Sequence, residues 1–129
     1  MQFERGKNLK EALSLGGYSF DTLRPGAIIV VTRRFGISDA EGKIRGINSC
    51  SLKLEKDSHL LITRISNICD PKRKEIHFIK HPKMNYFIIH DREILKQGQA
   101  YPGWRRTGHF GNMSKRMFDY RLKVLEPGF

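Results

Sequence analysis

The stretch from residue 24 to residue 36 reads RPGAIIVVTRRFG, and it decides the fold class of this chain. A Pro-Gly turn leads into the β-branched run of residues 27–34, a pattern that predicts a strand. Its apolar part, residues 27–31, is the longest apolar run in the chain and falls far short of the ~20 residues that a membrane helix needs. We therefore expect a β-rich protein in an intracellular, cytoplasmic setting.

Similar strand signals continue outward from this stretch. Alternation of Cys50, Leu52 and Leu54 with polar residues predicts a strand late in residues 43–56, and the apolar run HLLITRISNI predicts another at 59–68. Two short strands are expected at 75–80 and 86–90, around a turn at 81–85. The alternation of Phe118, Tyr120, Leu122 and Val124 predicts a half-buried strand near the end of the chain, with these four side chains facing the core.

Helices are expected only as short elements. Asn8, with Glu11 three residues later, is typical of a helix start, and Gly16 and Gly17 would end that helix. Asp91 is a plausible cap for one or two helical turns that stop at Gly98. Short turns between strands favour antiparallel pairing.

The predicted fold is mainly β, or β-rich α+β. We expect a small antiparallel barrel or a strongly curved sheet of about six or seven short strands, because a closed or nearly closed sheet removes exposed edges. The 129 residues suit a single domain, 1–129. Within it, residues 1–20 would form a helical segment packed on the sheet, and residues 26–125 the β-rich body.

Residues 27–47 contain a strand, a turn and then Gly42, Lys43, Ile44 and Ile47. This pattern resembles the KOW-type entry into an SH3-like barrel, although the loop is longer than usual. The resemblance implies an SH3-like arrangement of the strands and contact with RNA or ribosomal partners.

Charge is the most informative bulk property. Lysine and arginine number 24 against 13 acidic residues, which gives a net charge of +11. Residues 71–129 carry 13 of these cations and 5 of the acids, so the excess lies mainly in the second half. Such a charge favours a polyanionic partner, nucleic acid above all, and leaves open an acidic protein partner or a role in solubility alone.

Residues 101–120 interleave aromatic rings with cations, which is a pattern for binding single strands by base stacking and phosphate contact. Trp104 beside Arg105 and Arg106 is the best local candidate. The alternative is that the loop plugs the end of a small barrel with Trp104 in the core. We favour a divided role, in which Trp104 anchors the loop and the two arginines face the partner.

Other cations cluster in loops that a barrel could bring to one side, although charged loops are also commonly just solvated. The full set of predicted nucleic-acid contacts is Arg33, Arg34, Lys43, Arg45, Lys72, Arg73, Lys74, Lys80, Lys83, Trp104, Arg105, Arg106, Lys115, Arg116 and Arg121.

An enzyme is the second hypothesis. Cleavage of RNA by acid–base chemistry needs a base, an acid and cations around the phosphate. The residue types are present in a basic chain, and the candidates are His77, His90, His109, Glu75 and Arg105, with Tyr86 beside them. Many basic domains with five histidines would pass this test, so no catalytic residue is assigned.

No cofactor is expected, because the chain lacks a dinucleotide or phosphate-binding glycine loop. The histidines and Asp91 lack the spacing of a metal motif, so no metal site is predicted. The two cysteines, Cys50 and Cys69, are expected to be reduced. The sequence thus predicts first a non-catalytic binder of RNA or single-stranded DNA, second a small metal-independent endoribonuclease, and third a structural protein of a nucleoprotein particle that meets an acidic partner. It does not predict the oligomeric state.

Overall fold

Strand β1 (Ile28–Val31) forms in the β-branched run that follows the Pro-Gly turn, as the sequence predicts. Gly26 in that turn has a φ of +93°, a conformation that L side chains rarely adopt. The computed structural model describes residues 19–37, 44–45, 52–67, 72–82, 86–99 and 107–129. The expected N-terminal helix at residues 8–17 lies outside these residues.

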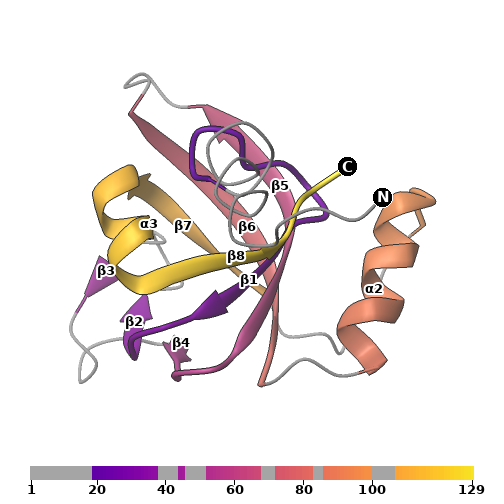
Figure 1. The fold of residues 1–129 in the computed structure, drawn as a ribbon, viewed down its shortest axis with the longest axis horizontal. Coiled ribbons are helices and arrows are strands. Elements are labelled where there is room, and N and C mark those ends of the chain that lie inside the picture. Colours follow the sequence, from indigo (N-terminus) through magenta and orange to yellow (C-terminus); the bar gives the residue numbers. More distant parts are fainter. Residues whose placement is uncertain (1–18, 38–43, 46–51, 68–71, 83–85, 100–106) are drawn as a thin grey trace, which may run out of the picture.

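Strand β1 belongs to a five-stranded sheet with strand order β7-β6-β5-β1-β8 and antiparallel pairing throughout (Figure 1). Its other strands are β5 (His59–Asn67), β6 (Arg73–His81), β7 (Thr107–Ser114) and β8 (Leu122–Glu126). Strands β5 and β6 are the longest, with nine residues each, and they pair with each other along most of their length.

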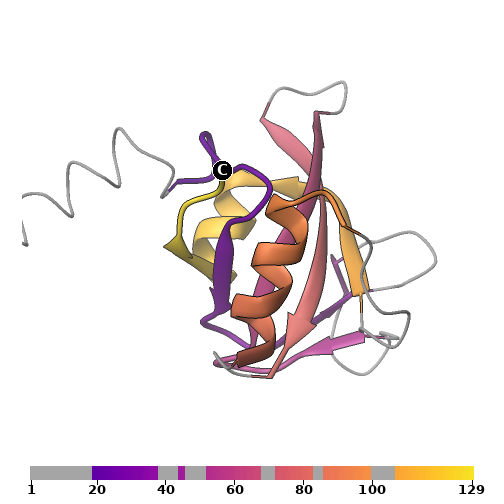
Figure 2. The same ribbon diagram turned by 90° about the vertical axis from the view of Figure 1, so that its right-hand side faces the viewer.

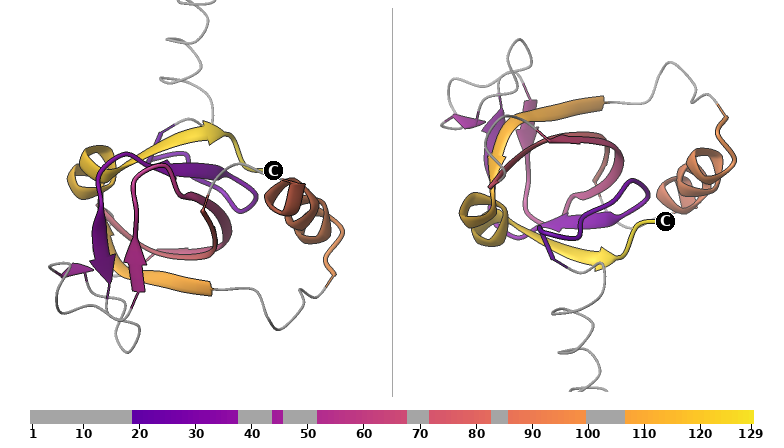
Figure 3. Two further views of the ribbon diagram at one scale, coloured as in Figure 1. Left: turned by 90° about the horizontal axis from the view of Figure 1, so that it is seen from below. Right: turned by 90° about the horizontal axis from the view of Figure 1, so that it is seen from above.

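A second, three-stranded sheet has the order β3-β2-β4. It consists of β2 (Phe35–Ile37), β3 (Ile44–Arg45) and β4 (Leu52–Leu54). The large sheet curves strongly around the core, as the views along its strands show (Figure 3). The described strands do not close into one barrel, because β7 and β8 remain the two edges of the large sheet. The curved sheet is therefore confirmed, and the closed barrel is not.

The core lies between the concave side of the large sheet and the small sheet. Phe35, Leu52 and Leu54 of the small sheet pack in one cluster with Phe78 and Phe110 of the large one. The rings of Phe78 and Phe110 lie 4.8 Å apart between centroids. Alternation along the strands sends every second side chain of β6 and β7 into this core and leaves the others on the outer, convex face.

Helix α2 (Tyr86–Lys96) replaces the strand expected at 86–90, so that prediction is wrong. Its apolar residues Ile88 and Leu95 share one face, and they pack on Ile28, Leu61 and Ile79 on the outer face of the sheet. Figure 2 shows α2 crossing that face. Residues 86–90 are aromatic and β-branched and have strand propensity, but burial of this apolar patch outweighs that propensity. The helix can therefore be predicted only when the sheet that it covers is known.

The cap expected at Asp91 is also wrong, because this residue lies in the middle of α2 and is fully buried. The predicted stop is confirmed: the helix ends at Lys96 and Gly98 follows with a φ of +71°. A glycine just past a helix end takes this conformation without the steric cost that a side chain would add.

The expected strand over residues 116–127 is only half correct. Residues Lys115–Arg121 form helix α3, which links the two edge strands, and β8 begins at Leu122. The Ser114 hydroxyl caps α3 by accepting a hydrogen bond of 3.2 Å from the Met117 amide. Phe118 is buried, as predicted, but Tyr120 is 53% exposed and is not a core residue.

Two strands have no counterpart in the sequence predictions. Strand β2 follows the arginine pair that was taken as the end of the first strand, and β7 runs through the glycine-rich part of residues 101–120. Neither described helix is long and apolar enough to span a membrane.

Candidate nucleic-acid interface

Three neighbouring strands place a row of polar side chains on the outer face of the large sheet. The backbone register sets Arg64 of β5 opposite His77 of β6, and His77 opposite His109 of β7. Alternation along β6 buries Ile76 and Phe78 in the core and turns His77 outward. A bulge in β5 between Ile62 and Arg64 brings the arginine onto the same face as His77.

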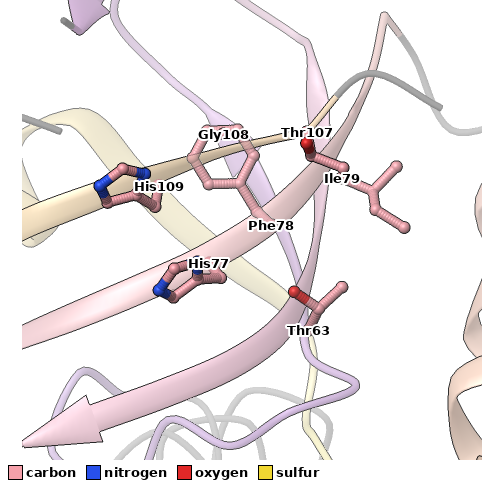
Figure 4. Close-up of a pocket in the computed structure, with 7 residues that line it drawn as sticks. All are labelled: Thr63, His77, Phe78, Ile79, Thr107, Gly108 and His109. Carbon is pink, nitrogen blue, oxygen red and sulfur yellow. The ribbon is translucent and has the colours of Figure 1, made fainter. Parts of the chain in front are cut away.

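The two imidazoles of this row stack on each other. The ring centroids of His77 and His109 lie 5.0 Å apart, and their planes differ by 13°. Figure 4 shows the rings side by side on adjacent strands, while Phe78 projects to the other side of β6. Both rings remain partly exposed, so their edges are accessible from solvent.

The Nε2 atom of His77 has two polar neighbours. Glu75 Oε1 lies 2.9 Å from it and Arg64 Nη2 lies 3.2 Å from it. A single ring nitrogen either donates or accepts, so it can satisfy only one of these groups at a time. When Nε2 carries a proton it donates to Glu75, and the neutral ring then keeps its lone pair on Nδ1. When Nε2 is unprotonated it accepts from Arg64 instead.

A hollow of about 410 Å³ opens beside the histidine pair. Ile79, Gly108 and Phe78 line it, with the Phe78 ring itself turned into the core, and hydroxyl groups stand at Thr63 and Thr107 (Figure 4). The hollow is open to solvent, and its mixed lining can take a flat ring together with a polar group. This volume lies in the ~300–1,000 Å³ range of sites for small molecules.

Three of the residues named for the ribonuclease hypothesis meet at this place. Glu75, His77 and His109 lie on one face of β6 and β7. His90 lies at an exposed position on helix α2 and not on these strands. Arg105 lies outside the described residues, and the side chain of Tyr86 does too.

Arg64 is the member of the row that the sequence predictions missed. It stands on the solvent side of β5 and is the one charged residue within the stretch HLLITRISNI, apart from the histidine at its start. A charged residue at a mid-strand position of this kind is a usable signal, because such residues are rare in a strand covered on both faces.

Lys74 is the clearest departure from the predicted set of basic contacts. Its side chain is only 8% exposed, and its ammonium donates a hydrogen bond of 2.6 Å to the Phe20 carbonyl oxygen. Burial lowers the pKa of Lys74, and the charge of Asp21 opposes that effect only in part. Lys74 therefore ties residues 20–21 to β6 and is not part of an exposed basic surface.

The other cations expected around residues 72–83 do not share one face. Lys80 lies opposite buried Leu60 and so belongs to the inner side of the sheet, where it is partly exposed. Lys72 is exposed beside the start of β6, and Arg73 Nη1 donates to the Asn112 carbonyl oxygen at 3.5 Å. Among the described cations of β6, only Arg73 lies at a position that faces the same side of the sheet as His77.

A second group of cations surrounds α3. The Arg33 guanidinium lies 4.5 Å from the centre of the exposed Tyr120 ring, and that of Arg121 lies 4.9 Å from the Phe35 ring. Arg116 and Tyr120 also line a hollow of about 510 Å³ beside the helix. Stacked arginine and tyrosine can offer a flat, cationic surface.

Two further predicted cations are paired with acids. Arg34 lies 4.0 Å from Glu55, and Lys115 lies 2.8 Å from Asp21, both at exposed positions. Arg45 belongs to β3, where only its backbone is described. The remaining predicted contacts lie outside the described residues: Lys43, Lys83, Trp104, Arg105 and Arg106.

The candidate interface is thus the row Arg64–His77–His109 with Glu75 and the adjoining hollow, which we call the histidine face. None of its four residues is among the predicted nucleic-acid contacts, and all four lie on the strands themselves. No family model, curated protein or solved structure matches this chain, so its own geometry and charge carry the functional argument.

Proposed function

We propose that this protein binds single-stranded nucleic acid on the histidine face. The observation that carries the proposal is the row of Arg64, His77 and His109, with two stacked imidazoles beside an open hollow of about 410 Å³. Aromatic rings and cations side by side on a sheet suit a flexible strand, whose bases stack while its phosphates meet positive charge.

The size and the lining of the hollow favour an unpaired base over a duplex. Ile79 and Gly108 line the hollow without charge, and Thr63 and Thr107 provide groups that can bond to a base edge. In a duplex the bases are stacked inside the helix, so they would not reach such a hollow. A duplex would meet only the cations.

Charge supports the same class of partner. The chain carries a net charge of +11, and Arg64 of β5 and Arg73 of β6 lie at positions on the outer face of the large sheet. Contacts of this kind with phosphates release counterions, so affinity for a single strand falls with salt, with a slope of about −0.7 per phosphate neutralised. We include Arg33, Arg116 and Arg121 around Tyr120 as a secondary contact region for a longer strand.

The proposal is tested by fluorescence anisotropy with labelled single-stranded RNA, single-stranded DNA and duplex DNA over a salt series. We expect both single strands to bind more tightly than the duplex at 150 mM salt. Arg64→Gln should weaken binding and make the salt slope less steep by about 0.7. The matched control is Lys53→Gln, which removes the same charge from an exposed position on β4 of the other sheet.

Three results would count against the proposal. One is equal loss of binding in Arg64→Gln and Lys53→Gln, which would mean that binding depends on the total charge of the protein and not on a particular site. Another is preference for the duplex. The third is loss of binding to all three ligands at 150 mM salt, which would turn attention to an acidic protein partner. Quenching of Trp104, the single tryptophan, in the same titrations would test the expectation that its loop meets the strand.

A further inference from the structure

We infer that the histidine face also cleaves RNA, with His77 as general base, His109 as general acid and Arg64 as the group that stabilises negative charge. The inference rests on the proposed binding function and adds a reaction to it. It depends on four side chains from three strands that the fold brings together: Arg64, Glu75, His77 and His109.

The reaction is an attack of the RNA on its own backbone. The 2′-oxygen forms a bond to the adjacent phosphorus as the base removes its proton. The bond between phosphorus and the 5′-oxygen breaks, and the acid gives a proton to that oxygen. The products are a 2′,3′-cyclic phosphate and a free 5′-hydroxyl, so one proton is taken and one is returned, and no other reactant is consumed.

His77 is placed to act as the base. Glu75 Oε1 lies 2.9 Å from its Nε2, and a carboxylate at this distance holds the proton on that nitrogen. Nδ1 of the neutral ring then carries the lone pair that accepts the 2′-hydroxyl proton. Glu75 further stabilises the imidazolium that forms, which is the role an orienting carboxylate has beside a general base.

His109 is placed to act as the acid. Its ring stacks on that of His77 with centroids 5.0 Å apart, so one phosphodiester lying along the ring edges can meet both residues. A protonated His109 can donate to the departing 5′-oxygen while His77 receives the proton of the 2′-oxygen. Both rings come from adjacent strands of one sheet, and such a support holds catalytic groups in place better than a loop does.

Arg64 supplies the electrostatic part. Its Nη2 atom lies 3.2 Å from His77 Nε2 and is exposed, so the guanidinium is within the width of one imidazole ring of a phosphate held at His77 Nδ1. The non-bridging oxygens gain negative charge as the 2′-oxygen attacks, and a fixed cation stabilises that charge. The hollow next to the rings would hold a base that flanks the cleaved bond.

The inference is tested with two labelled oligonucleotides of one sequence that contains every dinucleotide step, one of RNA and one of 2′-deoxynucleotides. We expect the protein to bind both and to cut only RNA, leaving 2′,3′-cyclic phosphate ends that a phosphatase does not remove. His77→Ala and His109→Ala should each slow cleavage by about 10²–10⁴-fold. Arg64→Gln should slow it by about 10²–10³-fold. Glu75→Gln keeps the shape of the side chain and should slow cleavage while binding persists.

His59→Ala, purified in parallel, is the matched control. It removes a histidine from β5 whose Nδ1 lies 2.9 Å from the nearby Asp57 carbonyl oxygen, and cleavage should be unchanged. Circular dichroism should show each variant folded, and His77→Gln and His109→Gln replace any alanine variant that is not. Equal cleavage by wild type and both histidine variants would overturn the inference, because the activity would then not come from this site.

RNA that binds and stays intact would also overturn the inference and leave the proposed binding function standing. If neither oligonucleotide binds, the proposed function fails together with the inference. Binding of the 2′-deoxy strand therefore separates the two failures. Cleavage of the 2′-deoxy strand would contradict the mechanism directly, since that strand has no 2′-oxygen to attack.

Discussion

His81 and Asp91 form a buried hydrogen-bonded pair that joins β6 to α2. His81 Nε2 lies 3.2 Å from Asp91 Oδ2, and the two side chains are 7% and 0% exposed. The pair stands next to the apolar contact of Ile88 with Ile79, so it fixes where the helix lies on the sheet. Buried polar groups of this kind cost stability when one partner is removed.

The first prediction concerns this pair. His81→Ala should lower the free energy of unfolding by about 1–3 kcal/mol, because the Asp91 carboxyl loses a donor inside the protein. Amide hydrogen exchange should become faster in α2 than in β5 and β6. His59→Ala is the control, since His59 lies opposite His81 in the sheet and is more exposed. Equal effects of the two variants in urea unfolding would contradict a role of the buried pair.

The same pair shows where sequence reasoning stops. Asp91 has the residue type of a helix cap, and the run before it has strand propensity, so local pattern assigns both wrongly. The helix forms because Ile28, Leu61 and Ile79 leave an apolar patch on the outer face of the sheet that needs cover. That patch exists only after β1, β5 and β6 pair, and no local window contains this information.

Long apolar runs and most alternating segments were predictable, since β1, β4, β5 and much of β6 lie where expected, but the alternation of residues 118–124 marked a strand only from Leu122. The types of the residues on the histidine face were predictable as well, since Glu75, His77 and His109 were named. Their proximity was not, because it depends on the register of β6 with β7, and β7 was not recognised in a glycine-rich segment.

The second prediction compares Phe118 and Tyr120, which the sequence placed together in the core. Phe118 is 2% exposed and contacts Phe20 at 5.4 Å between ring centroids, whereas Tyr120 is 53% exposed. Phe118→Ala should cost about 3–5 kcal/mol of stability. Tyr120→Ala should change it by about 0.5 kcal/mol or less, as exposed positions do. Urea unfolding of both variants measures the difference. Similar losses of stability would contradict the placement of Phe118 in the core and of Tyr120 on the surface.

The third prediction separates Lys74 from the surface cations. Lys74→Met keeps the apolar stem and removes the ammonium that bonds to the Phe20 carbonyl oxygen. The variant should lose about 1.5–3 kcal/mol of stability, the usual contribution of a hydrogen bond from a charged group. Its salt slope for single-stranded nucleic acid should stay that of the wild type, in contrast with Arg64→Gln. A shallower slope in Lys74→Met would instead place this lysine in the interface.

The fourth prediction concerns pH. The hydrogen bond from Lys115, 2.8 Å long, lowers the pKa of the Asp21 carboxyl below that of an aspartate side chain in an unfolded chain. A carboxyl whose pKa is lower in the folded protein than in the unfolded chain contributes stability above the unfolded value. That contribution is lost as the pH falls through the folded pKa. Lys115→Gln should therefore raise the pKa of Asp21, which a carbon-detected NMR titration of the carboxyl measures directly.

Lys53→Gln is the control for this titration, because Lys53 lies on the small sheet and is not among the groups that shift the pKa of Asp21. An unchanged Asp21 titration in Lys115→Gln would show that the contact does not persist in solution. Exposed pairs are often weak for this reason, since salt and water screen them.

The fifth prediction tests how the core positions the histidine face. Gly108 precedes His109 in β7, and a Cβ added there would lie 2.7 Å from Leu52 Cδ2 and 2.9 Å from Phe78 Cζ. Both neighbours are buried, so Gly108→Ala should cost about 1–3 kcal/mol through overpacking. Leu52→Val shortens the nearer side chain and makes room for the new methyl group. We therefore expect the double variant to be more stable than the sum of the two single effects predicts, which a double-mutant cycle in urea measures. Additive effects would mean that β7 moves away from the small sheet instead, and His109 should then lose its stacking on His77, visible as a change in the imidazole proton shifts of both rings.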